Sequence, residues 1–452
     1  MAKKQDSFSY TQSALRDLAQ EILDYAKANG ASACETDISE GFGRSISVRR
    51  GQLETIEYNR DKGIGVTVYL GQQRGHASSS DFSRAALRAS VDAALSIARF
   101  TAPDPAAGLP DADRLWQGKA KEIAKLDLHH AWKISPEAAT EIAQRCEAAA
   151  FDVSPQVTNS DGSSVYVQES QFVSANSLGF CGGFATSRHS ISVGVIAGEG
   201  DDMQTGDWYS SARDPRELAD PARIGDYAAR RALSRLGSRR APTCEVPVIF
   251  EAPQACGLLG SFVNAVSGGA LYRRASFLVD ALGQPVFSDN IHIDELPHIP
   301  KAMGSTMFDD EGIATQARQV VAGGVLQGYF LGSYSARKLG MQSTGNAGGC
   351  HNLIVRPGQK SLEELAREVG RGLLVTELLG QGVNYVTGDY SRGAAGYWIE
   401  NGEISYPVQE ITIAGNLREM FKNIVAIGND TIIRGGKQCP SLVIGKMTIA
   451  GE

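Results

Sequence analysis

The order of predicted elements constrains the fold most, because helix, antiparallel meander and helix occur twice in the amino-terminal half. In the first copy, apolar residues at helical spacing predict an amphipathic helix over residues 11–29, which Asn29-Gly30 ends. Alternating apolar and polar or small residues follow between residues 46 and 70, with Arg50-Gly51 and Asp61-Lys62-Gly63 as turns. Such alternation is typical of an antiparallel sheet with one solvated face.

A second helix closes this first copy, and the whole order then recurs. Asp81 is expected to cap that helix, and residues 101–108, rich in Pro, Ala, Gly and Asp, are expected to form a linker. In the second copy, Ser135-Pro136 opens a helix, strands lie within residues 164–195, and Asp220-Pro221 opens the closing helix. The two copies share this pattern without sequence identity.

The remainder of the chain is richer in glycine and in predicted strands. Residues 246–250 predict a short buried strand followed by a helix, and residues 312–321 and 328–334 are expected to flank the Ala322-Gly-Gly324 turn as a hairpin. A capping box at Ser361-Leu-Glu-Glu364 predicts a helix that continues to about Leu379. The last 65 residues are expected to form paired strands around two turns, Glu400-Asn-Gly-Glu403 and Arg434-Gly-Gly-Lys437.

These patterns predict an α+β fold with three parts. Two similarly built helix, meander, helix units at residues 1–110 and 111–238 precede a larger β-rich domain at residues 239–452. With 452 residues, of which 42% are hydrophobic, the chain can bury more than one core, since single cores stop growing near about 250 to 300 residues.

Charge and cysteine usage narrow the class of protein. The net charge of −7 argues against a direct nucleic-acid partner. Because the start is polar and the sequence lacks any run of about 18 apolar residues, we expect a cytoplasmic protein without a membrane segment. Seven widely spaced cysteines without a CxxC pair predict reduced thiols, not a disulfide framework or a zinc ribbon.

The sequence contains no zinc-hydrolase helix motif of the HExxH type. His292 and His298 have a loose ligand-like spacing, but Pro297 places them in a loop, for which a role without metal is favoured. Cys350 directly precedes His351, although adjacent residues of an extended backbone point to opposite sides. Such a pair is poorly arranged to act as nucleophile and base.

Residues 388–404, followed by residues 406–416, carry the most specific motif in the chain. This stretch closely resembles the carboxy-terminal signature of the PmbA (TldE) branch of the PmbA/TldD metallopeptidases, also called modulators of DNA gyrase. The resemblance covers nearly the whole chain. It implies a mostly α+β architecture and assembly with a TldD-like chain into a hydrolase that acts on unfolded peptides.

The same resemblance implies that this chain lacks the zinc ligands of TldD-like members. Their His-Glu-x-x-x-His motif matches residues 251–256, so Glu251 replaces the first histidine, Ala252 the general-base glutamate and Cys256 the second histidine. We therefore expect no metal in this chain and zinc in a TldD-like partner. The structural alternative is a first helical turn with Glu251 at its positive end and Cys256 packed inward. A zinc-ligand role is not carried over to Cys439.

The long motif also supplies candidates for contact with substrate or a partner. Tyr390, Tyr397 and Trp398 either bind there or are cross-strand packing in a sheet. Arg392 stands alone among small residues and is able to anchor a peptide carboxylate or a partner's acid, with a structural role as the alternative. His351 completes this set of candidates.

Three functions follow as hypotheses. The first is a non-catalytic subunit of a heterodimeric metallopeptidase that binds unfolded peptide by strand addition. The second is an autonomous hydrolase that works as a homodimer. The third is a non-proteolytic binding protein that modulates DNA gyrase or a toxin–antitoxin system.

Overall fold

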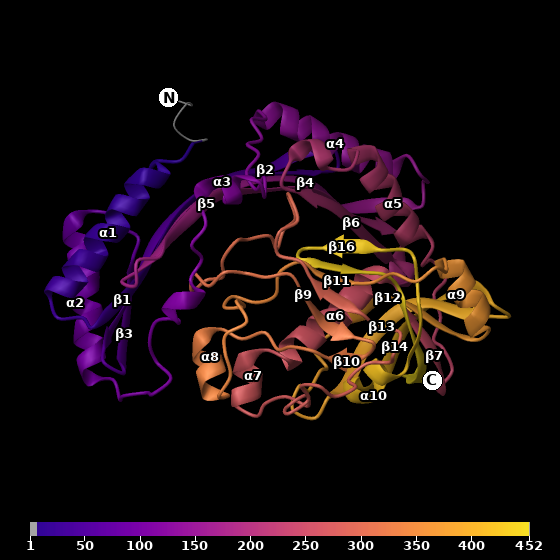
Figure 1. Cartoon of the computed structure of the whole chain (residues 1–452). Coiled ribbons are helices and arrows are strands. Elements are labelled where there is room, and N and C mark those ends of the chain that lie inside the picture. The colour runs from indigo at the N-terminus through magenta and orange to yellow at the C-terminus, as the bar shows by residue number, and fades with distance from the viewer. Residues whose placement is uncertain (1–6, 452) are drawn as a thin grey trace.

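The computed structural model describes residues 7–451. Residues 1–6, which contain the polar start used for the cytoplasmic prediction, and residue 452 lie outside the described residues. A long sheet from the amino-terminal half extends over the carboxy-terminal region, with helices on its outer face (Figure 1). The fold is α+β, as predicted.

The amino-terminal half contains two successive sets of five larger elements, with the short helix α3 between them. In chain order its elements are α1 (Gln12–Ala28), β1 (Ala33–Arg49), β2 (Gln52–Leu70), β3 (Gln73–Ser79), α2 (Arg84–Phe100), α3 (Ala120–Ala124), α4 (Pro136–Phe151), β4 (Val157–Asn176), β5 (Cys181–Ala197), β6 (Gln204–Ala212) and α5 (Pro221–Leu233). The predicted opening of α4 by Ser135-Pro136 is confirmed, because the Ser135 hydroxyl accepts from the backbone N–H of Ala138.

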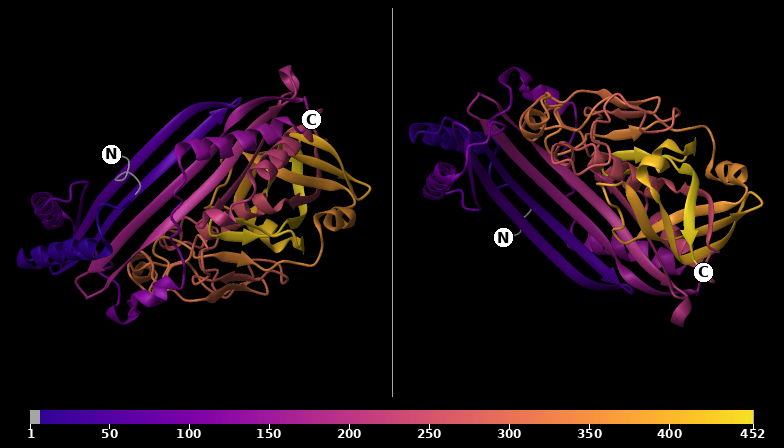
Figure 2. Two further views of the ribbon diagram at one scale, coloured as in Figure 1. Left: turned by 90° about the horizontal axis from the view of Figure 1, so that it is seen from above. Right: turned by 90° about the horizontal axis from the view of Figure 1, so that it is seen from below.

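The two predicted units share a single antiparallel sheet in the order β3-β2-β1-β4-β5-β6. β1 pairs with β4 from Glu35 opposite Asn176 to Val48 opposite Ser163, so the sheet is continuous across the boundary between the units. Helices α1 and α2 cover one end of the long strands, and α4 and α5 cover the other end (Figure 2). The predicted domain boundaries themselves stay predictions.

Two local predictions in this half are wrong. Asp61-Lys62-Gly63 is not a turn but lies inside β2, where Asp61 pairs with Gly41 and Gly63 with Ser39. Pairing along the whole of β1 satisfies the backbone there and overrides the local turn preference. The cap of α2 is Ser83, whose hydroxyl accepts from the Ala86 N–H, whereas Asp81 accepts from Ser83 one step earlier.

The carboxy-terminal part contains short strands in two further sheets and, among the described residues, five helices. In chain order its elements are β7 (Cys244–Phe250), α6 (Ala252–Ala265), α7 (Gly268–Tyr272), β8 (Ile293–Glu295), β9 (Arg318–Ala322), β10 (Val325–Leu326), α8 (Ser333–Lys338), β11 (Leu353–Val355), α9 (Leu362–Val369), β12 (Gly372–Leu379), β13 (Asp389–Glu400), β14 (Glu403–Asn416), α10 (Leu417–Lys422), β15 (Ile424–Ile427), β16 (Ile432–Arg434), β17 (Lys437–Cys439) and β18 (Leu442–Ala450).

These strands form one sheet in the order β10-β9-β8-β11-β17-β16 and another in the order β14-β13-β12-β7-β18-β15. α6 belongs to the large apolar core of this region, where Phe262 is fully buried. Both turns predicted in the last 65 residues are confirmed. Asn401 and Gly402 have φ of 54° and 80° between β13 and β14, which suits the tight hairpin turn for which Asn-Gly is preferred.

Two predictions in this part are wrong. The helix that begins at Ser361 ends at Val369, because Gly370 has a φ of 67°, and the residues expected to continue it form the buried strand β12. β12 pairs with β7 and β13, and this tertiary pairing overrides the helical reading. The hairpin around Ala322-Gly-Gly324 exists, but β10 is only Val325–Leu326, and α8 begins within the residues predicted as its continuation.

An aromatic cluster joins the amino-terminal sheet to the carboxy-terminal part. The ring of Phe308 lies 5.1 Å from Phe180 and 5.8 Å from Phe184 between ring centroids. Phe308 is buried, so this contact contributes apolar burial between the two parts.

Among the helices within residues 7–451, none combines the length and the apolar character that a membrane span requires.

Candidate functional site

Glu251 lies where β7 ends and α6 begins, and its carboxylate contacts an arginine from α5. Arg231 donates from Nη1 to Glu251 Oε1 at 2.9 Å and from Nη2 to Oε2 at 3.1 Å. Although burial by itself disfavours the charged guanidinium, the contact with Glu251 raises the pKa of Arg231 above its usual value. Both carboxylate oxygens are therefore engaged in a bidentate ion pair, the strong form of this contact.

Cys256 lies on the inward side of α6, with only 6% of its surface exposed, and Ala252 is also buried. The Cys256 thiol interacts with the fully buried thiol of Cys439 on β17. This interaction lowers the pKa of Cys256 against the effect of burial, and the charges of Arg434 and Lys437 lower it further. The structure thus brings Cys256 and Cys439 together, a contact that the sequence reasoning did not assign.

The histidines considered as ligands or bases have other partners. The His298 ring lies 3.0 Å from the Thr315 hydroxyl, and Nδ1 of His292 accepts from the Gly323 N–H. The His351 ring contacts the carbonyl of Gly345 at 2.8 Å, and its backbone N–H donates to Glu295. Within residues 7–451, no group of three or more His, Cys, Asp or Glu side chains is arranged to hold a metal ion.

The candidates of the long motif lie along β13. Tyr390 and Trp398 are each 2% exposed in the carboxy-terminal core, and burial raises the pKa of Tyr390 to about 12. Tyr397 contacts the hydroxyl of Ser234 at the end of α5, at 2.5 Å, and Nε of Arg392 donates to the Leu379 carbonyl at 3.4 Å. These four side chains do not meet Glu251, Cys256 or His351 in one site.

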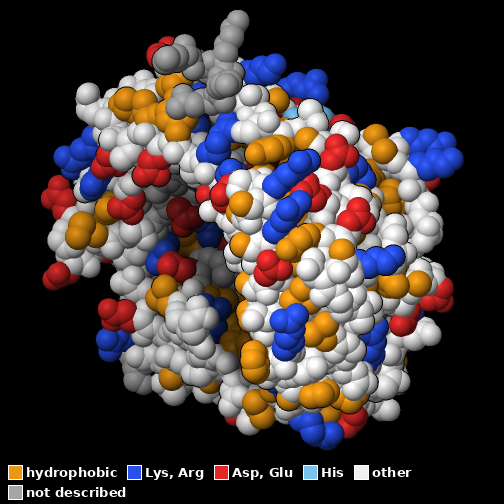
Figure 3. Space-filling view, turned by 90° about the vertical axis from the view of Figure 1, so that its left-hand side faces the viewer, with side chains coloured by type: hydrophobic (Ala, Val, Ile, Leu, Met, Phe, Trp, Pro, Cys, Tyr) orange, Lys and Arg blue, Asp and Glu red, His pale blue; other side chains and the backbone are white. Residues whose placement is uncertain are grey.

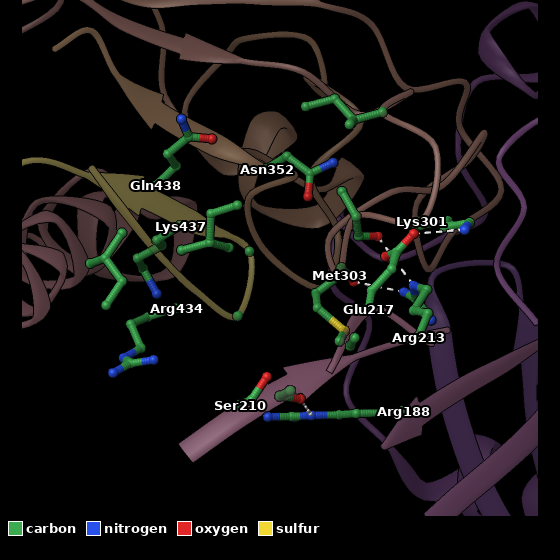
Figure 4. Close-up of a pocket in the computed structure, with 18 of the residues that line it drawn as sticks. Arg188, Ser210, Arg213, Glu217, Lys301, Met303, Asn352, Arg434, Lys437 and Gln438 are labelled. Atoms are coloured by element: carbon green, nitrogen blue, oxygen red, sulfur yellow. Dashed lines mark hydrogen bonds and ion pairs between the residues drawn. The ribbon is translucent and has the colours of Figure 1, made fainter. Parts of the chain in front are cut away.

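A cavity lies between the amino-terminal sheet and the carboxy-terminal part, and we name it the cationic cavity. Its volume is about 560 Å³, and its walls come from β6, the segment 299–303 and the β16–β17 hairpin. Five basic side chains line it, and Figure 4 labels them all: Arg188, Arg213, Lys301, Arg434 and Lys437. Glu217 is the acidic residue among the lining side chains.

The basic side chains of the cationic cavity are held in different ways. Lys301 donates to Glu217 at 2.7 Å and to Asp214 at 2.8 Å, so its charge is balanced. Arg213 is 8% exposed and donates to the carbonyls of Ala302 and Met303, and burial lowers its pKa to about 10. The Arg434 guanidinium stacks on aromatic rings of β6, 4.4 Å from the centroid of Trp208 and 4.2 Å from that of Tyr209.

A second cavity of about 510 Å³ lies on the far side of Met303 and is rich in carboxylates. We name it the acidic cavity. Asp37 from β1, Asp309 and Asp310 line it together with Phe308 and His351. Burial raises the pKa of all three carboxyls, for Asp309 to about 7. Met303 lines both cavities, so the two are neighbours.

Two free strand edges border the cationic cavity. β6 is the last strand of the amino-terminal sheet and pairs with β5, and β16 is the last strand of its own sheet and pairs with β17. Within residues 7–451, no strand pairs with the outer edge of β6 or of β16.

Seen from the end that carries α1 and α2, the molecule is hollowed, with acidic and basic side chains around the opening (Figure 3).

The sequence reasoning missed the residues that line the cationic cavity. Arg434-Gly-Gly-Lys437 was predicted correctly as a turn, and two cations around a glycine pair were the signal available there. Arg188 and Arg213 stand far from that turn in the chain, and sheet pairing together with the docking of the carboxy-terminal part brings them to it.

Family models support the resemblance stated from the long motif. The PmbA/TldA metallopeptidase domain 1 matches residues 34–98, the central domain matches residues 129–236, and the C-terminal domain matches residues 243–451. The chain belongs to the PmbA/TldD metallopeptidase family. The members of this family that the chain resembles are named metalloproteases. The α+β fold of the chain agrees with its membership.

Individual members of the PmbA/TldD family match over nearly their full length. The chain is 46% identical to the metalloprotease PmbA of Escherichia coli O157:H7, over 97% of this chain and 96% of the relative. It is 44% identical to a PmbA homologue of Haemophilus influenzae, over 97% and 96% of the two chains. A crystal structure of a modulator of DNA gyrase from Bacteroides thetaiotaomicron superposes with a TM-score of 0.90 at 29% identity, covering 97% and 99%.

Proposed function

We propose that this chain is the PmbA-type, non-catalytic subunit of a cytoplasmic metallopeptidase that degrades or processes unfolded peptides. A TldD-like chain pairs with it and supplies the zinc ion. The observation that carries this proposal is the bidentate contact of Arg231 with Glu251, at the position matched to the first zinc-binding histidine of TldD-like members.

The donor set at the matched positions does not suit a catalytic zinc ion. Such a site needs three ligands, an open position and a base near the metal-bound water. The carboxylate of Glu251 is neutralised by Arg231, Ala252 has no proton acceptor, and Cys256 lies beside a second thiol. A partner with the complete His-Glu-x-x-x-His sequence would supply both the ligands and the base.

The distribution of relatives supports a TldD-like partner. Haemophilus influenzae has a PmbA homologue, 44% identical to this chain, and also a TldD homologue, 24% identical over 84% of this chain. Buchnera aphidicola from Acyrthosiphon pisum likewise has both kinds. The two branches therefore occur side by side in one organism, as a heteromeric enzyme requires.

The free edges of β6 and β16 support peptide handling by this chain. An extended peptide that adds to a sheet edge is held by backbone hydrogen bonds, which are available whatever its sequence. Both edges border a cavity large enough for peptide side chains, since ligand sites commonly measure about 300 to 1,000 Å³. Strand addition there would suit unfolded substrates.

The test is to express this chain alone and together with the TldD-like chain of the same organism. We expect a heteromeric complex by size measurement, with zinc and chelator-sensitive peptidase activity in the complex and neither in this chain alone. Substituting the first histidine of the partner's motif should abolish activity without dissociating the complex.

Three results would contradict the proposal. Stoichiometric zinc with peptide cleavage by this chain alone would indicate an autonomous homodimeric hydrolase. A complex whose activity is unchanged when this chain is omitted would remove its role as a subunit. Binding to DNA gyrase or a toxin–antitoxin component, without any TldD-like chain and without proteolysis, would indicate a modulator.

A further inference from the structure

The cationic cavity holds more positive charge than its own residues balance. Lys301 is paired with Glu217 and Asp214, which leaves four cations: Arg188, Arg213, Arg434 and Lys437. Within residues 7–451, none of these four forms an ion pair with a carboxylate, and the three arginines contact a hydroxyl, backbone carbonyls and aromatic rings. The cavity therefore carries an uncompensated positive field.

This charge cannot be relieved by proton loss at neutral pH. A guanidinium stays protonated in proteins, and even the buried Arg213, whose pKa is lowered to about 10, remains charged. Four like charges around one cavity raise the free energy of the empty site. An anionic group that enters the cavity lowers it.

The arrangement of Arg434 indicates a group that is held ready for a ligand. Stacking on Trp208 and Tyr209 fixes its guanidinium plane without using its N–H donors on a carboxylate. A planar guanidinium with free donors matches the two oxygens of a carboxylate. Arg434 is also the last residue of β16, so its side chain stands directly beside a free strand edge.

The lining is apolar as well as cationic. Ile433 on β16 is 64% exposed, and Met303 and Trp208 line the same cavity. Apolar side chains beside free backbone donors and acceptors suit an extended peptide more than a free inorganic anion, which would use only the charges.

We propose that the cationic cavity binds an extended peptide segment bearing a carboxylate, with Arg434 and Lys437 as the main anchors. The peptide backbone adds to the free edge of β16 or β6, and an aspartate, a glutamate or the peptide's terminal carboxylate enters the cavity. This inference rests on the proposed peptide-handling role and names the substrate class for it, namely acidic unfolded segments.

The experiment measures peptide binding to the full chain by fluorescence anisotropy. The probes are labelled peptides of about eight residues, close to the length of a typical strand, that share one apolar sequence and carry two central Glu, Gln or Lys residues. Each is made with a free and with an amidated carboxy terminus. We expect the Glu peptide to bind about ten-fold more tightly than the Gln peptide, with the difference shrinking at high salt.

The two termini separate the sources of the carboxylate. If amidation weakens all three peptides equally and Glu offers no gain, the terminal carboxylate is the ligand. If amidation has no effect and Glu retains its gain, the ligand is a side chain. Binding that changes neither with the central residues nor with amidation would overturn the proposal.

Variants locate the site. Lys437→Gln and Arg434→Gln should each remove most of the preference for Glu, whereas Arg434→Lys, which keeps the charge, should retain much of it. Arg84→Gln is the matched control, because Arg84 is an exposed cation on α2, outside the cavity. A preference that survives in the double variant Arg434→Gln/Lys437→Gln would also overturn the proposal. Thermal unfolding shows which variants fold, and the salt dependence of the wild type gives the test independently of them.

The proposed function and this inference fail separately. Loss of the heteromeric complex, or cleavage by this chain alone, would contradict the proposed function while leaving an acidic preference intact. Conversely, an active complex whose binding and cleavage of peptides depend neither on Glu nor on a free carboxy terminus would contradict only the inference.

Discussion

The cationic and acidic cavities lie on either side of Met303, and each concentrates one sign of charge. They differ in how the like charges are tolerated. In the acidic cavity, burial raises the pKa of Asp37, Asp309 and Asp310, so these groups can bind protons and lose their repulsion. In the cationic cavity, the arginines cannot lose their protons at neutral pH, so their mutual repulsion remains.

The comparison shows that proximity of like charges has different consequences in the two cavities. Carboxylates whose repulsion is relieved by protonation make the stability of the fold depend on pH. Guanidinium groups keep their charge and therefore favour the binding of an anion. Each half of this contrast can be tested separately, by stability for the carboxylates and by charge-dependent reactivity for the cations.

The aromatic support of the acidic cavity provides the largest effect. Phe308 is 3% exposed and packs against Phe180, Phe184 and Trp116. Phe308→Ala should lower the free energy of unfolding by about 3 to 5 kcal/mol, measured by urea denaturation, because it leaves a cavity between the sheet and the carboxy-terminal part. The control is Phe100→Ala at a 91% exposed position, which should be nearly neutral. A loss below about 1 kcal/mol for Phe308→Ala would mean that the cluster does not support the acidic cavity.

A cation that already has its carboxylate should matter for stability instead of ligand binding. Arg231 pairs with Glu251 near the cationic cavity, and both side chains are mostly buried. Arg231→Met should cost about 2 to 3 kcal/mol in urea denaturation, because it leaves Glu251 uncompensated.

The matched control for this variant is the neighbouring Arg230→Met. Arg230 is 68% exposed and pairs with Asp226, so its loss should cost no more than about 0.5 kcal/mol. Equal effects of the two variants would show that the Arg231–Glu251 pair behaves as an ordinary surface contact, and the reading of position 251 would lose its support.

The pH dependence of stability tests the acidic half directly. Burial, and next the nearby Glu311, raise the pKa of Asp309 from 3.8 to about 7, while backbone N–H donors oppose the shift. Between about pH 4 and pH 7, a carboxyl with this raised pKa holds its proton in the folded state and releases it in the unfolded state. Stability is therefore highest below about pH 4 for this group and is lost as the pH rises through 7.

Asp309→Asn should reduce this loss by on the order of 1 kcal/mol between about pH 5 and pH 8, measured as unfolding free energy against pH. Asp61→Asn, at an exposed position of β2, serves as control and should leave the slope unchanged. An unchanged slope in Asp309→Asn would mean that its three backbone N–H donors keep the carboxylate charged.

The smallest effect concerns the thiol beside the cationic cavity. Its interaction with Cys439, and the charges of Arg434 and Lys437, lower the pKa of Cys256. Lys437→Gln should slow alkylation of Cys256 roughly 2- to 3-fold at about pH 8, followed by mass spectrometry, because less thiolate is present. Cys34, whose pKa burial raises to about 12, should stay unlabelled in both proteins. Faster labelling of Cys256 in the variant would show that access, not charge, controls it.

Predictability differed between elements with local signals and elements formed by distant pairing. The opening of α4 at Ser135-Pro136 and the β13–β14 turn at Asn401-Gly402 were predicted correctly, because a capping hydroxyl and a left-handed turn are set by adjacent residues. The continuation of α9 and the turn at residues 61–63 were wrong, because pairing of β12 with β7 and of β2 with β1 decided both.

The candidate site divides in the same way. Positions 251, 252 and 256 were named from the sequence, but the sequence did not reveal that Arg231 occupies the carboxylate of Glu251 or that Cys439 meets Cys256. Both partners come from other elements, α5 and β17. The cationic cavity was missed as a whole, since its four unbalanced cations come from β5, the segment after β6, and the β16–β17 hairpin.

By itself, the sequence determined the family, the α+β class, the helix caps and the tight turns, since these depend on residues close together in the chain. Only the tertiary structure decided that the two units share one sheet, that the outer edges of β6 and β16 border one cavity, and that like charges gather in two neighbouring cavities. The physical reason is that strand pairing and electrostatic fields depend on distances in space, which long-range packing sets.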